Sequence, residues 1–163
     1  MDRELVSVII PAYNVDKFLG DCVRSLLCQT YTNYEIIIID DGSTDNTYVI
    51  GESLTFESTK VKVFRQENQG VSVARNVGMQ KAKGEFYVFV DADDIVAPRY
   101  IETLVFCAQK SDMGIIGFTS ERKELATEVN LNNVYVNASG VIENILCGSN
   151  YDGYLWNLSL IHI

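Results

Sequence analysis

The sequence predicts an α/β protein with a mostly parallel sheet and helices on both of its faces. Two observations predict this class. Short runs rich in Val and Ile alternate with helical patterns, and polar clusters follow the ends of several of these runs. The expected strands cover residues 6–10, 35–39, 61–64, 86–90 and 113–118. Sheets of this kind bind their ligands at the carboxyl ends of the strands.

Four helices are expected between these strands. The first covers residues 15–27, where apolar positions recur at helical spacing, and Asn14 is placed to cap it. The second begins near Thr44 or Asp45, and the third covers residues 71–82. The fourth follows Pro98 and turns four apolar residues inward, namely Ile101, Leu104, Val105 and Ala108.

The composition is that of one continuous domain. The chain has 163 residues, of which 47% are hydrophobic, and a chain of this length supports one core. Residues 1–118 carry the alternation of strands and helices, and residues 119–163 are expected to continue the same domain. There we expect a polar loop over 119–133, a strand over 134–136, a helix over 141–146 capped by Ser139, and an end at 155–163 that looks cut off and lacks packing partners.

Charge and hydropathy restrict the partners and the compartment. The formal net charge of −9 argues against a nucleic-acid partner, because binding to a phosphate backbone depends on clusters of Lys and Arg. The N-terminus lacks a signal-peptide pattern, and no apolar run approaches the roughly 20 residues of a membrane helix. We therefore expect a soluble chain in the cytoplasm. Its cysteines show no CxxC or zinc-like spacing, and Cys22, Cys28 and Cys107 lie on or near apolar faces of expected helices. We interpret these three as core thiols and expect no disulfide.

The first polar cluster is Asp40-Asp41-Gly42-Ser43-Thr44-Asp45, directly after the isoleucine-rich run. The part from Gly42 onward is typical of a turn followed by a helix cap. A turn does not explain two successive carboxylates at the mouth of a sheet, where they could accept hydrogen bonds from ribose hydroxyls or a base N–H. Both a turn role and a ligand role remain open for Asp40 and Asp41.

The second cluster places Asp91, Asp93 and Asp94 directly after the run at 86–90. Like charges this close repel one another, and each pair at ~4 Å costs on the order of 1 to 4 kcal/mol. A divalent cation removes this cost, because Mg²⁺ and Mn²⁺ prefer oxygen ligands and are held by one or two carboxylates plus substrate phosphates. The alternative is a solvated acidic loop without a metal.

The third cluster, residues 70–78, opens the third expected helix and contains Arg75 and Gly78. One interpretation is an ordinary amphipathic helix, with Arg75 on the solvent face and Gly78 allowing close packing. The other starts from charge. An acidic protein that binds an anionic ligand needs a local positive charge, which an arginine or a metal ion can supply.

Together and in this order, the clusters resemble glycosyltransferase family 2, whose catalytic domain has the GT-A fold. The resemblance runs from Val6 to about Asn157 and rests on residues 8–14, 29–31, 35–43, 74–78, 84–86 and 91–94. It implies a three-layer, Rossmann-like fold that binds a nucleotide sugar. It implies donor contacts by Pro11, Ala12, Tyr13, Asp40, Asp41, Arg75, Asp91, Ala92 and Asp93, and a Mn²⁺ or Mg²⁺ ion held by Asp93 and Asp94.

The resemblance further implies an inverting, metal-dependent transfer from a nucleotide sugar, expected to be a UDP-sugar, to a saccharide or lipid-linked acceptor. Such a protein would serve polysaccharide biosynthesis and, in its full-length form, could associate with the inner face of the membrane. In the family the general base lies further along the chain than residue 163. The catalytic residue therefore stays unassigned, Asp152 being the last carboxylate, and these residues are expected to bind donor without transferring sugar.

Two other classes fit part of the pattern. Haloacid dehalogenase phosphatases would use Asp91 as nucleophile and Asp93 as acid, but they usually carry this motif on the first strand and need a later acidic pair. A receiver-like binding module would place its acidic residues after the first and third strands, whereas here they follow the second and fourth. Neither the glycine-rich dinucleotide fingerprint nor the P-loop pattern occurs, which disfavours those enzymes.

Overall fold

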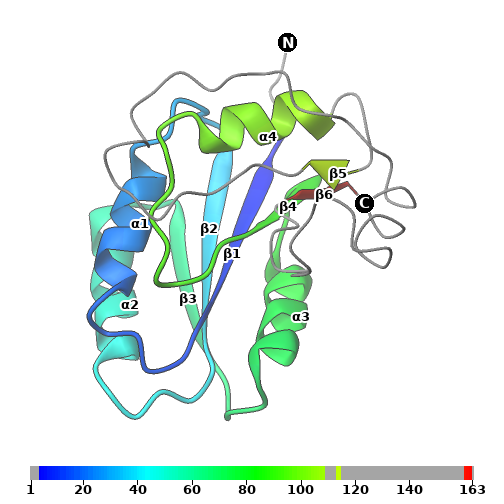
Figure 1. The fold of residues 1–163 in the computed structure, drawn as a ribbon. Coiled ribbons are helices and arrows are strands. Elements are labelled where there is room, and N and C mark those ends of the chain that lie inside the picture. Colours follow the sequence, from blue (N-terminus) through cyan, green and yellow to red (C-terminus); the bar gives the residue numbers. More distant parts are fainter. Residues whose placement is uncertain (1–3, 109–112, 115–159, 163) are drawn as a thin grey trace, which may run out of the picture.

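The computed structural model describes residues 4–108, 113–114 and 160–162. They form one sheet of six strands in the order β3-β2-β1-β4-β6-β5 (Figure 1). The strands are β1 (Val6–Ala12), β2 (Tyr34–Asp40), β3 (Val61–Arg65), β4 (Phe86–Phe89), β5 (Met113–Gly114) and β6 (Leu160–His162). The helices are α1 (Leu19–Leu27), α2 (Thr47–Glu57), α3 (Val71–Lys81) and α4 (Tyr100–Ala108).

The first four strands run parallel, which confirms the predicted sheet. Each lies within two residues of its predicted bounds, and the fifth predicted strand is described only at Met113–Gly114. Every residue of β2 is buried. Because helices cover both faces of this strand, its sequence is a continuous apolar run rather than an alternation of apolar and polar residues.

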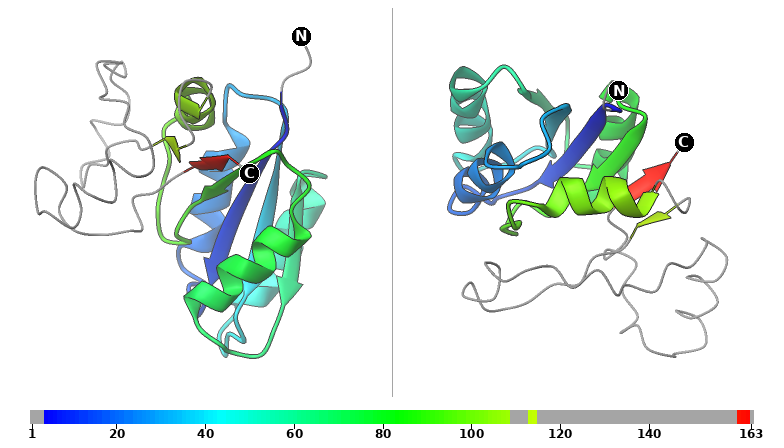
Figure 2. Two further views of the ribbon diagram at one scale, coloured as in Figure 1. Left: turned by 90° about the vertical axis from the view of Figure 1, so that its right-hand side faces the viewer. Right: turned by 90° about the horizontal axis from the view of Figure 1, so that it is seen from above.

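The helices form two layers, one on each face of the sheet (Figure 2). On one face, Leu26 of α1, Leu54 of α2 and Leu104 of α4 join the main hydrophobic core. On the other face, Ala74 of α3 packs against Ile37 and Ile39 of β2. The result is the three-layer α/β architecture that the sequence predicts.

Gly78 lets α3 lie directly on β1. A Cβ atom added at Gly78 would overlap with Cγ2 of Ile9, and a close-packed interior has no room for such an overlap. The predicted close packing at Gly78 is therefore confirmed. The inward residues of α4 are also confirmed, since Ile101, Leu104 and Val105 are buried and Ala108 packs against the same core.

The predicted start of α1 is wrong, and α2 starts slightly later than predicted. Asn14 does not cap α1, which begins at Leu19, because the Asn14 side chain instead accepts a hydrogen bond from the Thr44 N–H at 2.8 Å. α2 begins at Thr47, two residues after Asp45, whose carboxylate accepts hydrogen bonds from the Thr47 N–H at 2.9 Å and from the Asp16 N–H at 3.2 Å. Residue types that favour caps here join two loops, since their side-chain oxygens bind whichever N–H groups are near.

The expectation that the chain end lacks partners is wrong for residues 160–162. These residues form β6, which pairs antiparallel with β4 on one side and β5 on the other. His162 lies opposite Phe86, and Ile161 lies opposite Met113. The strand therefore has a neighbour along each edge with which its backbone N–H and C=O groups can pair.

Other predicted features lie outside the described residues. These are the loop at 119–133, the strand at 134–136, the helix at 141–146 and Asp152. Cys22 and Cys28 are both free thiols; Cys22 is buried as expected, whereas Cys28 is exposed, so its interpretation as a core residue is wrong. Within the described ranges, no helix is long and apolar enough to cross a membrane.

Candidate functional site

The carboxyl ends of three neighbouring strands bring the predicted site residues together. β1 lies between β2 and β4, and Ala12 is opposite Asp40. Residues 11–13 therefore emerge with Asp40 and Asp41 on one side and with Asp91, which follows β4, on the other. The two acidic clusters are far apart in the sequence, but the strand order makes them flank the end of β1.

Hydrogen bonds connect the loop after β1 to the loop after β2. The Asn14 N–H donates to Ser43 Oγ at 3.0 Å, and the Thr44 N–H donates to Asn14 Oδ1 at 2.8 Å. The Val15 N–H donates to Thr47 Oγ1 at 2.8 Å, and the Asp16 N–H donates to Asp45 Oδ2 at 3.2 Å. Tyr13 lies directly before this connection and is 48% exposed. The loop contacts thus hold an exposed aromatic residue at the edge of the candidate site.

Asp41 anchors the loop between β3 and α3. Its side chain is buried, with Oδ1 accepting hydrogen bonds from Gln66 Nε2 at 2.7 Å and from the Gln69 N–H at 2.9 Å, while Oδ2 accepts from the Gly70 N–H at 2.8 Å. A carboxylate has about four lone-pair positions. One position on Oδ2 remains for a further donor.

Asp40 is fully buried and stabilises the turn at residues 40–43, directly after β2. Its Oδ1 accepts a hydrogen bond from the Ser43 N–H at 3.3 Å, and Oδ2 forms an ion pair with Arg65 Nε at 3.2 Å without hydrogen-bond geometry. Gly42 between them has a φ of 73°, and a Cβ atom there would lie 2.8 Å from the Asn68 nitrogen. Only glycine fits this position, because both the backbone angle and the space exclude a side chain.

Arg75 of α3 reaches across to the acidic segment. Its Nη2 donates to Asp91 Oδ1 at 2.8 Å, and its side chain is only 25% exposed. The interpretation that placed Arg75 on the solvent face is therefore wrong. Arg75 Nε is buried and has no hydrogen-bond partner among the described residues. The Arg75 guanidinium therefore places a positive charge beside the acidic segment.

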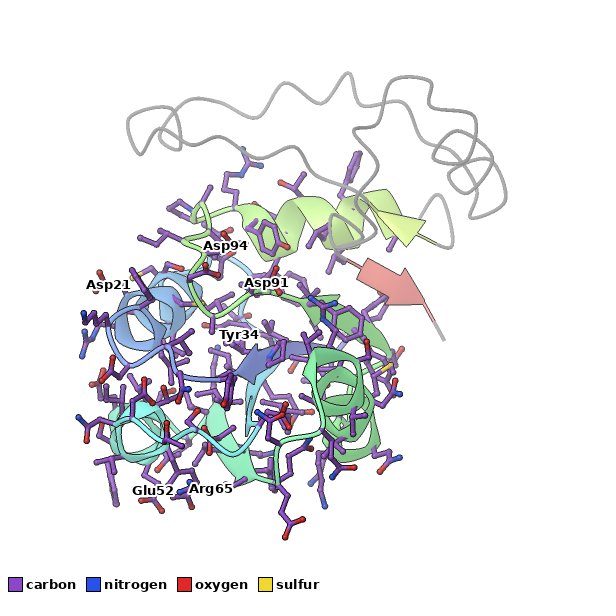
Figure 3. The ribbon with its side chains drawn as sticks, turned by 60° about the horizontal axis from the view of Figure 1, so that its bottom comes forward. Asp21, Tyr34, Glu52, Arg65, Asp91 and Asp94 are labelled. Atoms are coloured by element: carbon purple, nitrogen blue, oxygen red, sulfur yellow. The ribbon has the colours of Figure 1, made fainter. Side chains whose placement is uncertain are left out.

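Residues 91–94 form a tight turn, closed by a hydrogen bond from the Asp94 N–H to the Asp91 carbonyl oxygen at 3.0 Å. Figure 3 shows Asp91 and Asp94 in the segment that leads from β4 to α4. Ala92 is buried, whereas Asp93 and Asp94 are exposed. Desolvation on the side of Asp94 that faces the protein, followed by repulsion from Asp91 and Asp93, raises the pKa of Asp94. The turn therefore concentrates negative charge that a cation would relieve.

The described residues contain no group of three or more His, Cys, Asp or Glu side chains arranged to hold a metal ion. A cation at Asp93 and Asp94 would thus need oxygen ligands from elsewhere, and phosphate oxygens are suitable. Beneath the turn, burial followed by the charges of Asp94, Asp93 and Asp91 raises the pKa of Cys22 to about 12. This thiol is uncharged at neutral pH and acts as a packing residue.

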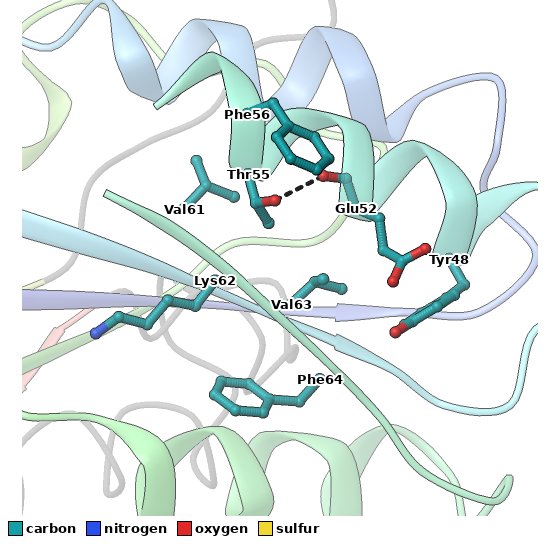
Figure 4. Close-up of a pocket in the computed structure, with 8 residues that line it drawn as sticks. All are labelled: Tyr48, Glu52, Thr55, Phe56, Val61, Lys62, Val63 and Phe64. Atoms are coloured by element: carbon teal, nitrogen blue, oxygen red, sulfur yellow. Dashed lines mark hydrogen bonds between the residues drawn. The ribbon is translucent and has the colours of Figure 1, made fainter. Parts of the chain in front are cut away.

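A pocket of about 540 Å³ lies between α2 and β3, at the edge of the sheet (Figure 4). Its lining consists of Tyr48, Glu52, Thr55, Phe56, Val61, Lys62, Val63 and Phe64. It contains none of the predicted donor-site residues. It lies along the body of a helix and an edge strand, so we do not assign it to the site at the end of β1.

Sequence reasoning named the acidic residues of this site but missed the polar residues that hold them. Gln66, Gln69 and Gly70 surround Asp41. Ser25 of α1 and Gln29, in the loop after this helix, bind the segment that follows the acidic turn. Residues 29–31 enter the sequence analysis only as part of the family resemblance. Gln29 binds Ala97 and Ile101, about 70 residues away, and no local sequence signal predicts these contacts.

The family described as Glycosyl transferase family 2 matches residues 7–137. The chain is 46% identical over 114 residues to the glycosyltransferase GlyG of Streptococcus pneumoniae, a match that covers 69% of this chain and 38% of GlyG. The chain thus spans less than half the length of this relative.

Two solved structures share the fold. TarS 1-349 of S. aureus in complex with UDP-GlcNAc has a TM-score of 0.66 and 25% identity, over 96% of this chain and 45% of TarS 1-349. GalNAc-T7, crystallised with UDP, GalNAc and Mn²⁺, has a TM-score of 0.59 and 33% identity, over 66% of this chain and 21% of GalNAc-T7. With the family match over most of its length and this GT-A fold, the chain belongs to glycosyltransferase family 2.

Proposed function

We propose that this chain forms the donor-binding part of an inverting, metal-dependent glycosyltransferase that acts on a saccharide or lipid-linked acceptor. The observation that carries the proposal is the placement of Asp41 and the acidic turn 91–94 on either side of the end of β1, in a member of family 2. Such a site offers hydrogen-bond acceptors on one side and cation-binding carboxylates on the other.

We assign the nucleoside to the side of Tyr13 and Asp41. The exposed Tyr13 ring offers a face on which a base can stack, and Asp41 Oδ2 keeps one position for a base N–H or a ribose hydroxyl. Pro11 and Ala12 line the same end of β1, and Asp40 supports the turn from below. A uridine nucleotide is the proposed ligand, since TarS 1-349 and GalNAc-T7 were crystallised with UDP-GlcNAc and UDP respectively.

We assign the diphosphate and its cation to the acidic turn. Asp93 and Asp94 are the exposed carboxylates. The pKa of Asp94 is raised first by desolvation and then by repulsion from Asp91 and Asp93, and Mn²⁺ or Mg²⁺ would relieve this repulsion. When bound, the cation offsets negative charge on the leaving diphosphate. Arg75 holds Asp91 in place, and the buried Ala92 keeps the turn close to the core.

In the proposed reaction, an acceptor hydroxyl attacks the anomeric carbon while the bond from that carbon to the diphosphate oxygen breaks. The hydroxyl proton passes to a general base, for which we assign no carboxylate of the described residues. The described residues bind and orient the donor. Holding the donor in one geometry is itself a large part of the catalysis of such transfers.

Calorimetric titration with UDP tests the proposal. We expect Mn²⁺ to raise the UDP affinity of the chain by at least about tenfold over the value in EDTA, a difference of about 1.4 kcal/mol. Asp93→Asn should remove most of this gain, because it removes one cation-binding carboxylate at an exposed position and leaves the core unchanged.

Glu52→Gln is the matched control, because it removes the same charge from an exposed residue in the middle of α2. It should bind UDP and Mn²⁺ as wild type does. Equal UDP affinity in EDTA and in Mn²⁺ would contradict the cation assignment. Absence of UDP binding under both conditions would contradict the donor site itself.

A further inference from the structure

The acidic turn continues into a segment, residues 95–101, that forms hydrogen bonds with the end of α1 and with the loop after it. The Val96 N–H donates to Ser25 Oγ at 3.1 Å, and the Thr30 N–H donates to the Pro98 carbonyl oxygen at 2.9 Å. Gln29 lies between these two contacts in the sequence and is itself buried, with 9% of its surface exposed. The end of α1 and the loop that follows it therefore bind the segment just after the carboxylates.

Gln29 makes the central hydrogen bonds between this loop and the segment at residues 95–101. Its Nε2 donates to the Ala97 carbonyl oxygen at 2.8 Å and to the Ser25 carbonyl oxygen at 3.2 Å, while its Oε1 accepts from the buried Ile101 N–H at 3.0 Å. One amide thus binds the segment after the turn and the first turn of α4. Only Asn and Gln side chains carry both a carbonyl acceptor and an NH₂ donor.

The other end of the acidic turn is fixed independently. Asp91 pairs with Arg75, and the Asp91 carbonyl oxygen lies 3.5 Å from Cys22 Sγ, which donates a weak hydrogen bond. Asp93 and Asp94 therefore lie between two anchored points. A cation site tolerates little displacement of its carboxylates, and side chains that orient the ligands affect affinity without touching the ion.

We infer that Gln29 is a positioning residue for cation-dependent donor binding, acting through the Ala97 carbonyl and the Ile101 N–H on the placement of Asp93 and Asp94. This inference rests on the proposed function. It assigns to the loop after α1 a role in ligand binding, although this loop is distant in the sequence from residues 91–94.

Two variants of the full chain test it. Gln29→Glu keeps the shape and the acceptor for the Ile101 N–H but places an oxygen against the Ala97 and Ser25 carbonyls. Gln29→Leu removes all three hydrogen bonds. We expect the Mn²⁺ concentration at half-maximal UDP binding to rise about 10- to 100-fold in both variants. Saturating Mn²⁺ should restore a UDP affinity close to that of wild type, because Tyr13 and Asp41 are unchanged.

Hydrogen exchange without metal gives a second readout. In EDTA, peptides covering residues 95–101 should exchange faster in the Gln29 variants, while the loop at 66–70 should keep its protection. Glu35→Gln is the control for general destabilisation, since Glu35 is a buried residue of β2 at the opposite end of the strands. If Gln29→Leu does not fold, Ser25→Ala replaces it; it removes the acceptor for the Val96 N–H and the bond that the same hydroxyl donates to the Cys22 carbonyl oxygen within α1.

The outcomes separate the two claims. No Mn²⁺-dependent UDP binding by the wild-type chain would overturn the proposed function. Binding by wild type, with an unchanged Mn²⁺ midpoint in both Gln29 variants, would overturn the inference alone. An equal shift of the midpoint in Glu35→Gln, or a UDP affinity that saturating Mn²⁺ does not restore, would also overturn it, because either result indicates general destabilisation rather than positioning.

Discussion

Arg75 Nη2 and Asp91 Oδ1 lie 2.8 Å apart and join α3, on one face of the sheet, to the segment after β4. Their side chains are 25% and 41% exposed, so the pair is neither a fully solvated contact nor a buried one. The contact places the Arg75 guanidinium beside the carboxylates of the acidic turn at residues 91–94. An anion and a cation could therefore both be bound at the same place.

Arg75→Gln should separate binding from stability. The partial exposure of the pair limits the stability loss to about 1 kcal/mol, whereas UDP affinity in Mn²⁺ should fall by about tenfold, because Asp91 then repels the diphosphate without compensation. Urea unfolding and calorimetry measure the two effects. Arg24→Gln removes the same charge from the exposed ion pair with Glu57 and should leave the affinity unchanged. An unchanged affinity in Arg75→Gln would limit Arg75 to a structural role.

Asp41→Asn should lower both stability and nucleotide affinity. The Asn NH₂ group must face N–H donors that now bind a carboxylate, and losing such charged hydrogen bonds costs about 1.5 to 3 kcal/mol. We also expect weaker UDP binding at saturating Mn²⁺, because the proposed contact is to the nucleoside and not to the cation. Gln66→Ala, which removes a donor but keeps the carboxylate, should bind UDP as wild type does. If Asp41→Asn does so too, Asp41 only anchors the loop.

The sheet could be predicted from the sequence because its strands are buried on both faces. Strand β2 is a run of isoleucines that no exposed strand would contain, and its ends are marked by polar residues. The position of the acidic clusters followed from the same pattern, since parallel strands end at one edge. Arg75 could not be placed this way, because helical periodicity does not reveal that Asp91 lies within its reach.

The contacts between loops could not be predicted. Asn14 and Asp45 have the residue types of helix caps. Asn14 instead binds the Thr44 N–H, and Asp45 binds the Asp16 N–H in addition to the Thr47 N–H at the start of α2. Strand β6 has three described residues, too few for a period to be seen, and it is defined by its pairing with β4 and β5. In each case the partner is chosen by the fold and not by neighbours in the sequence.

Gly78→Ala should destabilise the chain by about 1 to 3 kcal/mol, as expected when a methyl group is forced into a packed core. The new Cβ would overlap with Ile9 Cγ2, so α3 must move away from β1. Ser72→Ala, at an exposed position of the same helix, should leave stability within about 0.5 kcal/mol. The midpoint of urea unfolding measures both. A Gly78→Ala variant as stable as wild type would show that α3 can shift without cost.

Glu35 forms a charged network at the start of β2, opposite the candidate site. Its side chain is buried and accepts hydrogen bonds from Lys62 Nζ at 2.7 Å, from the Lys83 N–H at 2.8 Å and from Ser7 Oγ at 2.8 Å. Burial by itself would raise the pKa of Glu35. The hydrogen bonds from Lys62, Lys83 and Ser7 together outweigh burial and hold the pKa below its ordinary value of 4.5.

A lowered pKa in the folded state means that the unfolded chain binds the proton more readily. The network's contribution to stability is therefore complete above pH 4.5 and is lost as the pH falls through the lower pKa of the folded state. Glu35→Gln, which removes the charge facing Lys62, should reduce stability by about 1.5 to 3 kcal/mol at neutral pH. This difference from wild type should shrink as urea unfolding is repeated at increasingly acidic pH, whereas Glu52→Gln should show little difference throughout. Acid removes the charge of Glu35 in the wild-type chain, and the variant has no charge there to lose. If the stability difference between Glu35→Gln and wild type stayed constant down to pH 3, the charge of Glu35 would not be its cause.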